Sequence, residues 1–398
     1  MTDNILSLSK KVFPEIVKLR RRLHQFPELA FEEFDTSDTI AAELGKIGIG
    51  VKRRVGKTGL IGILRGSSNS GVVALRADMD GLPVAEESGL EFASRNAGKM
   101  HACGHDAHMA MLVGAAMILS RLRKEVNGTV KFLFQPSEEK NPGGAPAMIK
   151  DGALSNPDVD VVFGQHVTNE LPSGKFGFRP GPIMASADEV YITVIGKGGH
   201  GAKPHETVDP VTIAARIVDS LQSVISRMKD PMDPSVLTIG SIHGGTAPNI
   251  IPDKVELAAT LRTMNEKWRK RAHELIIRTA SETAKAFGGS CKIVISHGYP
   301  VLVNSEQETL LARSALTSLY GKNAAVTIPP VMGAEDFAYY LQKAPGTFWW
   351  IETGSKKAGA TSSIHSSKFR IDESSLMHGA AFLAYLTIEY LRQRGRES

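Results

Sequence analysis

The sequence predicts an α/β fold: a mostly parallel sheet covered by helices, with a ferredoxin-like α+β domain inserted into it. Its 398 residues exceed the size at which one hydrophobic core usually stops growing, so two domains are expected. Apolar strand-like runs alternate with helical segments toward both ends of the chain. Between them the hydrophobic pattern changes to alternation with period two, which is typical of half-buried strands.

The first part of the predicted larger domain covers residues 1–186. Helices are expected near 8–25 and 36–47, the second one after the capping residues Asp35–Ser37. Strands separated by helices indicate a mostly parallel sheet that is covered on both faces. The strand-like runs are 58–66, 71–77, 128–135 and 160–167, with helices near 106–125 and after Gly144.

The predicted inserted domain covers residues 187–298. Its elements follow the order strand, helix, strand, strand, helix, strand, which is the ferredoxin-like order. The α/β pattern resumes in 299–398, where a strand at 347–352 and a helix from Glu373 complete the larger domain. The elements expected in the insertion are the strands 188–198, 235–245, 253–263 and 291–296 and the helices 208–228 and 266–287.

Composition argues against nucleic-acid binding and membrane insertion. The 47 basic and 42 acidic residues leave a net charge of +5, but the basic residues are scattered and form no stripe with aromatics. Such a charge is better explained as a mild attraction for a carboxylate-bearing molecule. The N-terminus lacks the apolar core of a secretory signal, and no run is apolar over the roughly 20 residues that a membrane helix needs. We therefore expect a cytoplasmic protein.

The segment 101–108 (HACGHDAH) places three histidines, a thiol and a carboxylate within eight residues, just before a predicted helix. The other cysteine, Cys291, opens an apolar alternating run, so the two cysteines form no disulfide framework. Metal binding explains Cys103 and His105 better than a structural role. Because no second close pair follows, the site is expected to be an open one that takes ligands from distant segments.

A pair of adjacent carboxylates, Glu138 and Glu139, follows the apolar run 128–135. Neighbouring side chains of extended backbone diverge, so one can bind metal while the other acts as a general base toward a water. On its own, this pair is explained equally well as a solvated turn. The layout of the remaining candidates favours the site.

Those candidates are His166, at the end of the run 160–167, and His365, ahead of the last helix. The carboxyl ends of parallel strands border one crevice, where ligands of open α/β sheets bind. Asp80 can accept the free N–H of a ligating histidine, and Asp78 can do the same or bind metal. The alternative for the two aspartates is an ordinary Asp-x-Asp-Gly turn.

Together these segments resemble the M20 metallopeptidase family. The resemblance rests on HACGHD, the Glu138–Glu139 pair, GQHV, GKGGHGAKPH and APNIIPD, and it extends over nearly the whole chain. The most similar branch comprises hippurate hydrolases, N-acyl-amino-acid amidohydrolases, auxin-conjugate hydrolases and a thermostable archaeal carboxypeptidase. The resemblance implies a two-metal catalytic domain and an inserted lid that forms dimers.

The resemblance also implies roles for individual residues. Glu138 would be the general base and later the proton donor, and His200 of the lid would stabilise the oxyanion in the partner subunit's site. Asn249 and Arg262 would hold the substrate, and Arg262 would bind the carboxylate of the substrate. The implied metal ligands are Cys103, His105, Glu139, His166 and His365.

We therefore expect a hydrolase with two divalent ions per subunit that cleaves N-acyl-amino acids or the C-terminal residue of short peptides. Thiolate and imidazole ligands favour zinc, with manganese or cobalt as substitutes. The expected assembly is a homodimer or homotetramer formed through the inserted domain. The alternatives are a dedicated deacetylase of the N-acetyl-diaminopimelate type and a non-catalytic, metal-stabilised binding protein.

Overall fold

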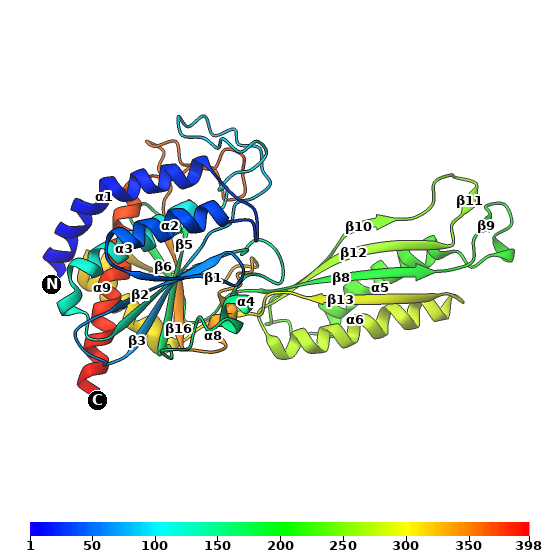
Figure 1. The fold of residues 1–398 in the computed structure, drawn as a ribbon. Coiled ribbons are helices and arrows are strands. Elements are labelled where there is room, and N and C mark those ends of the chain that lie inside the picture. The colour runs from blue at the N-terminus through cyan, green and yellow to red at the C-terminus, as the bar shows by residue number, and fades with distance from the viewer. Residues whose placement is uncertain (398) are drawn as a thin grey trace. The chain divides into compact units, whose positions relative to one another are not determined.

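The computed structural model describes residues 1–397, which form two compact units (Figure 1). The first unit comprises Met1–Gly181, Val303–Pro329 and the chain from Asp336 onward. The second comprises Pro182–Leu302 and Pro330–Glu335, so the predicted insertion 187–298 lies within it.

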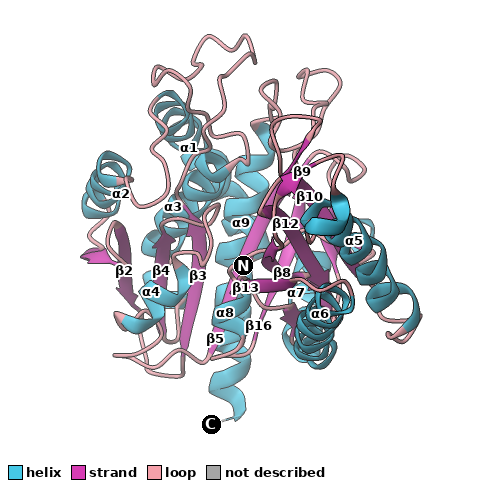
Figure 2. Cartoon of the chain, turned by 90° about the vertical axis from the view of Figure 1, so that its right-hand side faces the viewer, coloured by secondary structure: helices cyan, strands magenta, loops and turns pink. Residues whose placement is uncertain are grey.

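The first unit contains a sheet of eight strands, counted over the described residues, in the order β1-β2-β4-β3-β5-β16-β6-β15. The neighbours β4, β3, β5 and β16 run parallel, and β1 and β2 form an antiparallel edge (Figure 2). The mostly parallel sheet of an α/β fold is therefore confirmed in the central strands. The bounds are β1 Gly50–Val55, β2 Gly59–Arg65, β3 Val72–Asp78, β4 Thr129–Gln135, β5 Val161–Thr168, β6 Phe176–Phe178, β15 Ala325–Thr327 and β16 Gly346–Glu352.

Both faces of this sheet are buried, as alternate side chains of β16 show. Trp349 packs on Phe382 of α9, with 4.9 Å between ring centroids. Phe348 points to the opposite face and lies 5.2 Å from the ring of Phe337. The helices are α1 Thr2–Gln25, α2 Phe34–Lys46, α3 His105–Arg121, α4 Ala145–Lys150, α7 Glu306–Tyr320, α8 Ala338–Leu341 and α9 Ser374–Glu397.

Several features of this unit differ from the expectation, since α7, β6 and β15 were not predicted and two further differences have a clear cause. The strand β1 was not predicted, because Lys52 and Arg53 are exposed on an edge strand and break the hydrophobic pattern. The prediction that Asp35–Ser37 cap the second helix was wrong, because α2 begins at Phe34 and these residues lie in its first turn. The carboxylate of Glu28 accepts the N–H of Thr36 at 2.8 Å instead.

The second unit contains a four-stranded antiparallel sheet in the order β10-β12-β8-β13, which is the ferredoxin-like order. Every second residue of β8 is buried, and Val190, Ile192 and Val194 pack with Ile217 of α5 and Ile276 of α6. The elements are β8 Ser186–Ile195, α5 Pro210–Arg227, β10 Ser235–His243, β12 Lys254–Thr263, α6 Glu266–Ala286 and β13 Ser290–His297. Shorter strands are β7 Gly181–Met184, β9 Gly199–His200, β11 Ile250–Ile251 and β14 Leu302–Asn304.

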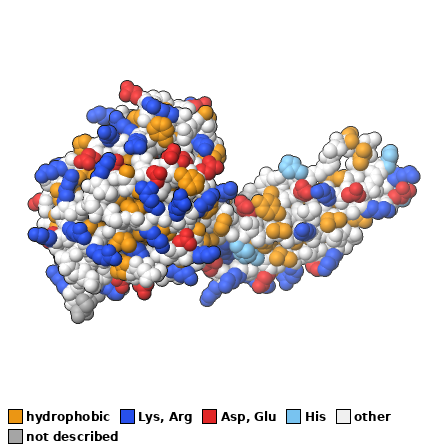
Figure 3. Space-filling view, in the orientation of Figure 1, with side chains coloured by type: hydrophobic (Ala, Val, Ile, Leu, Met, Phe, Trp, Pro, Cys, Tyr) orange, Lys and Arg blue, Asp and Glu red, His pale blue; other side chains and the backbone are white. Residues whose placement is uncertain are grey.

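No helix within residues 1–397 is long and apolar enough to cross a membrane. On the face seen in Figure 3, basic side chains are spread among acidic and neutral ones. This distribution agrees with the scatter of charge along the sequence.

A buried ion pair joins β8 to α6 in the second unit. Nε and Nη2 of Arg269 donate to the two carboxylate oxygens of Asp188 at 2.8 and 2.6 Å. His273 lies 2.7 Å from the same carboxylate. Burial alone would raise the pKa of Asp188, but hydrogen bonds from Arg269 and His273 hold this pKa well below its ordinary value.

We predict that Asp188→Ala destabilises the second unit by about 3–5 kcal/mol, because Arg269 would lose its buried partner and keep only the more exposed Glu266 as a charged one. Since the pKa of Asp188 is depressed by folding, its stabilisation is present above about pH 4 and is lost as the pH falls further. Urea unfolding at several pH values measures both effects. Glu282→Ala, which removes the exposed pair with Lys285, is the control. Equal stabilities of the two variants would contradict the prediction.

Candidate metal centre

The candidate ligands gather at the carboxyl ends of the parallel strands of the first unit. Glu138 and Glu139 follow β4, and His166 lies near the end of β5. Cys103 and His105 stand at the start of α3, which follows β3, and His365 lies in the segment between β16 and α9. Segments that are far apart in the sequence thus meet at one edge of the sheet.

The Cys103 thiol is the centre of this cluster. Its Sγ lies 3.3 Å from Nε2 of His166 and 3.3 Å from Nε2 of His365. Nε2 of His365 is also 3.3 Å from Oε1 of Glu139. Cys103, His105 and His166 form one group of potential metal ligands, and Cys103, Glu139 and His365 form a second.

Two histidines are oriented so that their Nε2 atoms face the cluster. Nδ1 of His105 lies 2.9 Å from the carbonyl of Asp80, and Nδ1 of His166 lies 2.7 Å from the carbonyl of Val167. Because a carbonyl only accepts, each Nδ1 must carry the proton. Nε2 of His105 is buried without a hydrogen-bond partner among the described residues, as expected of an atom that awaits a cation.

The cluster is strongly acidic. Burial alone would lower the pKa of His105, but Asp78, Asp80 and Glu139 raise it to about 10. Burial, followed by the charges of Glu139 and Glu138, raises the pKa of the Cys103 thiol well above its ordinary value. Without a metal, Arg76 pairs with Asp78, and the histidines beside Glu139 balance its charge when they carry protons. Divalent cations would replace these protons, so the donor set fits such ions.

Asp80 orients the carboxylate pair more directly than predicted. Its Oδ1 accepts the backbone N–H of Glu138 and its Oδ2 that of Glu139, both at 2.9 Å. The carboxylate is 3.3 Å from Nδ1 of His105, farther than the carbonyl of Asp80 itself. Asp80 therefore supports both the histidine and the two glutamates.

His108 belongs to the motif but has both ring nitrogens occupied. Nδ1 lies 2.6 Å from Oδ1 of Asp78, and Nε2 accepts the N–H of Val167 at 2.9 Å. His108 and Asp78 therefore tie the start of α3 to the ends of β3 and β5. The carboxylate of Asp78 contacts His108 and Arg76, and Asp78 also forms a group of potential metal ligands with His105 and His108, so its role toward a metal stays a prediction.

The hydrogen bonds that support the Gln135–Glu139 segment were not predicted from the sequence. The buried Arg76 donates to Asp78, to Gln135 and to Asp336 at 2.6, 2.9 and 2.8 Å. Asp336 also accepts from the side-chain amide of Gln135 and from the N–H of Ala145. Asp336 stands in the segment 333–337 (GAEDF), for which no site role was predicted.

Gly104 is required by the local geometry. It is the N-cap of α3, with φ +86°, a conformation that favours glycine. A Cβ on it would lie 2.4 Å from Cγ2 of Val167. The close approach of the α3 N-terminus to β5 brings Cys103 and His105 to His166.

The other predicted residues lie in the second unit. His200 on β9 pairs with Ile250, and the neighbouring Gly201 N–H donates to the carbonyl of Asn249 at 2.8 Å. Arg262 lies on β12, where its Nε donates to the hydroxyl of Thr260 at 3.2 Å. The roles of His200, Asn249 and Arg262 toward a substrate stay predictions.

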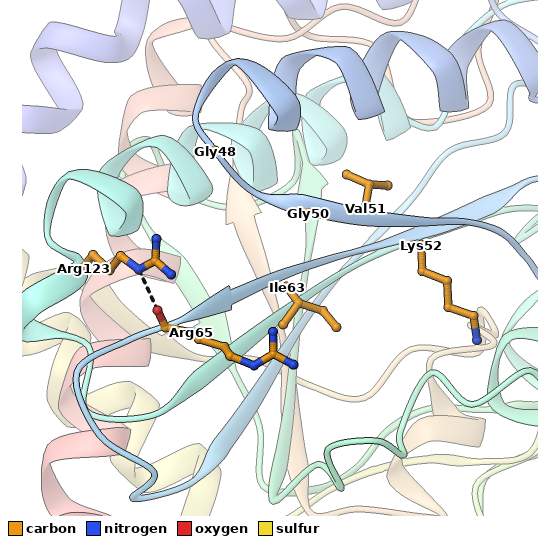
Figure 4. A pocket seen from close by; sticks show the side chains of 7 residues that line it. All are labelled: Gly48, Gly50, Val51, Lys52, Ile63, Arg65 and Arg123. Carbon is orange, nitrogen blue, oxygen red and sulfur yellow. Dashed lines mark hydrogen bonds between the residues drawn. The ribbon is translucent and has the colours of Figure 1, made fainter.

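A surface hollow of about 420 Å³ lies at the β1–β2 edge of the sheet and contains none of these groups (Figure 4). Its charged lining is Lys52, Arg65 and Arg123, and Arg123 donates to the carbonyl of Arg65 at 2.7 Å. With no acid or nucleophile in its lining, this hollow is not a candidate for hydrolytic chemistry.

Comparison with known proteins agrees with this geometry. The family described as "Peptidase family M20/M25/M40" matches residues 74–389. The chain belongs to this family. The resemblance stated from the motifs is thereby confirmed, and the chain is a member of a hydrolase family.

Individual relatives cover nearly the whole chain. Thermostable carboxypeptidase 1 of Saccharolobus solfataricus is 42% identical over 378 residues, 94% of this chain and 95% of that protein. N-acyl-L-amino acid amidohydrolase of Geobacillus stearothermophilus is 42% identical over 305 residues, 77% of this chain and 82% of that protein. The crystal structure of the Bacillus subtilis YXEP protein, described as a dinuclear metal-binding M20 peptidase, has a TM-score of 0.84 and 34% identity, covering 96% of this chain and 99% of that one.

We predict that Gly104→Ala lowers both stability and metal uptake. Left-handed backbone costs an alanine about 1–2 kcal/mol, and overpacking against Val167 adds about 1–3 kcal/mol. Gly98→Ala is a matched control, since Gly98 has φ +73° with no atom within 4 Å of the added Cβ. Urea unfolding and elemental analysis measure the two effects. Identical behaviour of the two variants would show that the contact with Val167 is unimportant.

Proposed function

We propose that the protein is a metal-dependent amidohydrolase. It would cleave the amide bond of N-acyl-amino acids, or release the C-terminal residue of short peptides. The observation that carries this proposal is the meeting of one thiol, three imidazoles and one carboxylate at a single sheet edge, with a second carboxylate, Glu138, beside them.

The relatives support the same chemistry. One is named a carboxypeptidase and another an N-acyl-L-amino acid amidohydrolase. Both activities hydrolyse an amide bond whose nitrogen belongs to an amino acid with a free carboxylate. One site can therefore serve both reactions, and the acyl group or peptide decides between them.

The proposed metal ligands are those predicted from the sequence. Two divalent cations bound there would lower the pKa of a water and polarise the scissile carbonyl. A thiolate and imidazoles favour zinc over magnesium or calcium. The ligands are Cys103, His105, Glu139, His166 and His365.

Glu138 is the proposed general base. Its Oε2 lies 3.9 Å from Nε2 of His105, so the carboxylate faces the cluster, and Asp80 fixes its backbone N–H. In the proposed reaction Glu138 takes a proton from the attacking water. It then delivers this proton to the leaving amine nitrogen, which releases the free amino acid.

The remaining roles follow from the family resemblance. His200 of the partner subunit donates to the developing oxyanion, which requires a homo-oligomer formed through the second unit. Arg262 binds the substrate carboxylate, because its planar guanidinium can donate two parallel hydrogen bonds. Asn249 holds the substrate as well.

We predict that complete removal of metal abolishes hydrolysis of N-benzoyl- and N-benzyloxycarbonyl-amino acids. The purified protein is dialysed against a chelator, its metal content is measured, and activity is assayed before and after adding back zinc, manganese or cobalt. A substrate panel that includes N-acetyl-diaminopimelate and short peptides distinguishes an enzyme of broad specificity from a dedicated deacetylase. Undiminished activity of the metal-free protein would refute the proposal.

We predict that Glu138→Gln retains bound metal but lowers kcat by about 10²–10⁴-fold, because the amide cannot accept the proton of the water. The control is Glu170→Gln, an acidic residue outside the cluster. Elemental analysis and steady-state kinetics measure the two quantities. A fully active Glu138→Gln variant would remove Glu138 from the mechanism.

A further inference from the structure

Three consecutive backbone N–H groups of the carboxylate-bearing segment donate to two buried carboxylates. Glu138 and Glu139 donate to Asp80, as described above. The N–H of Ser137 donates to Oε1 of Glu33 at 2.8 Å. Glu33 lies just before α2 and belongs to none of the motifs that predicted the site.

Ser137 needs this external support. Its φ is +54°, in the left-handed region that few residues other than glycine adopt. Serine can stabilise turns through its hydroxyl, but Oγ of Ser137 is buried without a hydrogen-bond partner in residues 1–397. The bond to Glu33 is therefore the side-chain contact that holds the turn, and the turn determines where the next residue, Glu138, points.

Glu33 is itself held rigidly. It is fully buried, Oε1 also accepts the N–H of Phe31 at 3.0 Å, and Oε2 accepts the hydroxyl of Thr58 at 2.5 Å. In the described part of the chain no lysine or arginine forms an ion pair with it. Burial, followed by the charge of Asp80, raises the pKa of Glu33 to about 7. A buried carboxyl that has hydrogen-bond donors but no cationic partner is costly to keep, which favours a specific role.

Capping of α2 does not explain why a buried carboxylate stands at position 33. It stands at the N-cap position, yet its side chain makes no capping hydrogen bond to the helix. The first turn of α2 is capped by Glu28 instead, which accepts the N–H groups of Asp35 and Thr36 at 3.3 and 2.8 Å. The carboxylate of Glu33 points to Ser137, on a segment 104 positions away in the sequence.

We propose that Glu33 is a positioning residue for the reaction: it holds the Ser137 turn so that the Glu138 carboxylate stays directed at the candidate metal centre. With Asp80 it forms a two-carboxylate support under residues 137–139. Glu33 acts through the backbone and touches no reacting atom. This inference rests on the proposed function, because it assigns Glu33 to the orientation of the general base.

The test compares four variants: Glu33→Ala, Glu33→Asp, Glu33→Gln and the control Glu28→Ala. Ala removes the acceptor, and Asp keeps the charge but is one methylene too short for Ser137. Gln loses the charge but keeps an oxygen that can accept the same N–H. We expect kcat to fall about 10–100-fold in the Ala and Asp variants, the usual effect of losing such support, with KM and metal content unchanged. The Gln variant should recover most of kcat, and Glu28→Ala should match the wild type.

Several outcomes would overturn the inference. If Glu33→Asp retained kcat while Glu33→Gln lost it, the charge of Glu33 rather than its contact with Ser137 would matter. If Glu28→Ala lost as much kcat as Glu33→Ala, displacement of α2 would be the cause. Should Glu33→Ala fail to fold, the Asp and Gln variants still decide between contact and charge.

The Glu138→Gln variant separates this inference from the proposed function. If Glu138→Gln loses turnover and the Glu33 variants keep it, only the inference on Glu33 is wrong. If Glu138→Gln is fully active, the proposed general base is wrong, and the role of Glu33 falls with it.

Discussion

The structure depends on burying several carboxylates at one edge of a parallel sheet. A buried carboxylate costs several kcal/mol unless hydrogen bonds or opposite charges compensate it. Asp78 is compensated by Arg76 and His108, and Asp80 by two backbone N–H groups. The charge partners of Glu139 within residues 1–397 are the imidazoles of His105 and His365. Divalent cations would balance this charge, which is why the cluster is a candidate metal centre.

The same constraint explains why the residues that orient the candidate ligands lie in segments next to the ligands themselves. β3 ends in Asp78, and the turn after it carries Asp80, so one short stretch supports His108, His105 and the glutamate pair. Arg76 and Asp336 hold Gln135 at the end of β4. His105, His166 and the two glutamates are thus held by contacts outside the cluster, which preorganises this part of the candidate metal centre.

Much of the fold follows from hydrophobic periodicity. The continuous apolar runs of β3, β4 and β5 and the alternation along β8 and β12 predicted the two kinds of sheet. The edge strand β1 escaped prediction, because exposed Lys52 and Arg53 need no hydrophobic pattern. The start of α2 was misplaced, since its cap comes from Glu28, six residues before Phe34, and not from the polar residues next to it.

By itself, the sequence determined which residue types can carry the chemistry. Short motifs of cysteine, histidine and adjacent glutamates can be recognised in the sequence because their residues are close together in the chain. Which side chains meet was decided only by the tertiary structure: Glu33 reaches Ser137 across 104 positions, and Arg76 reaches Asp336 across 260. Hydrogen bonds act over about 3 Å, so such partners exist only after the strand ends have been brought together. No local pattern in the chain encodes that distance.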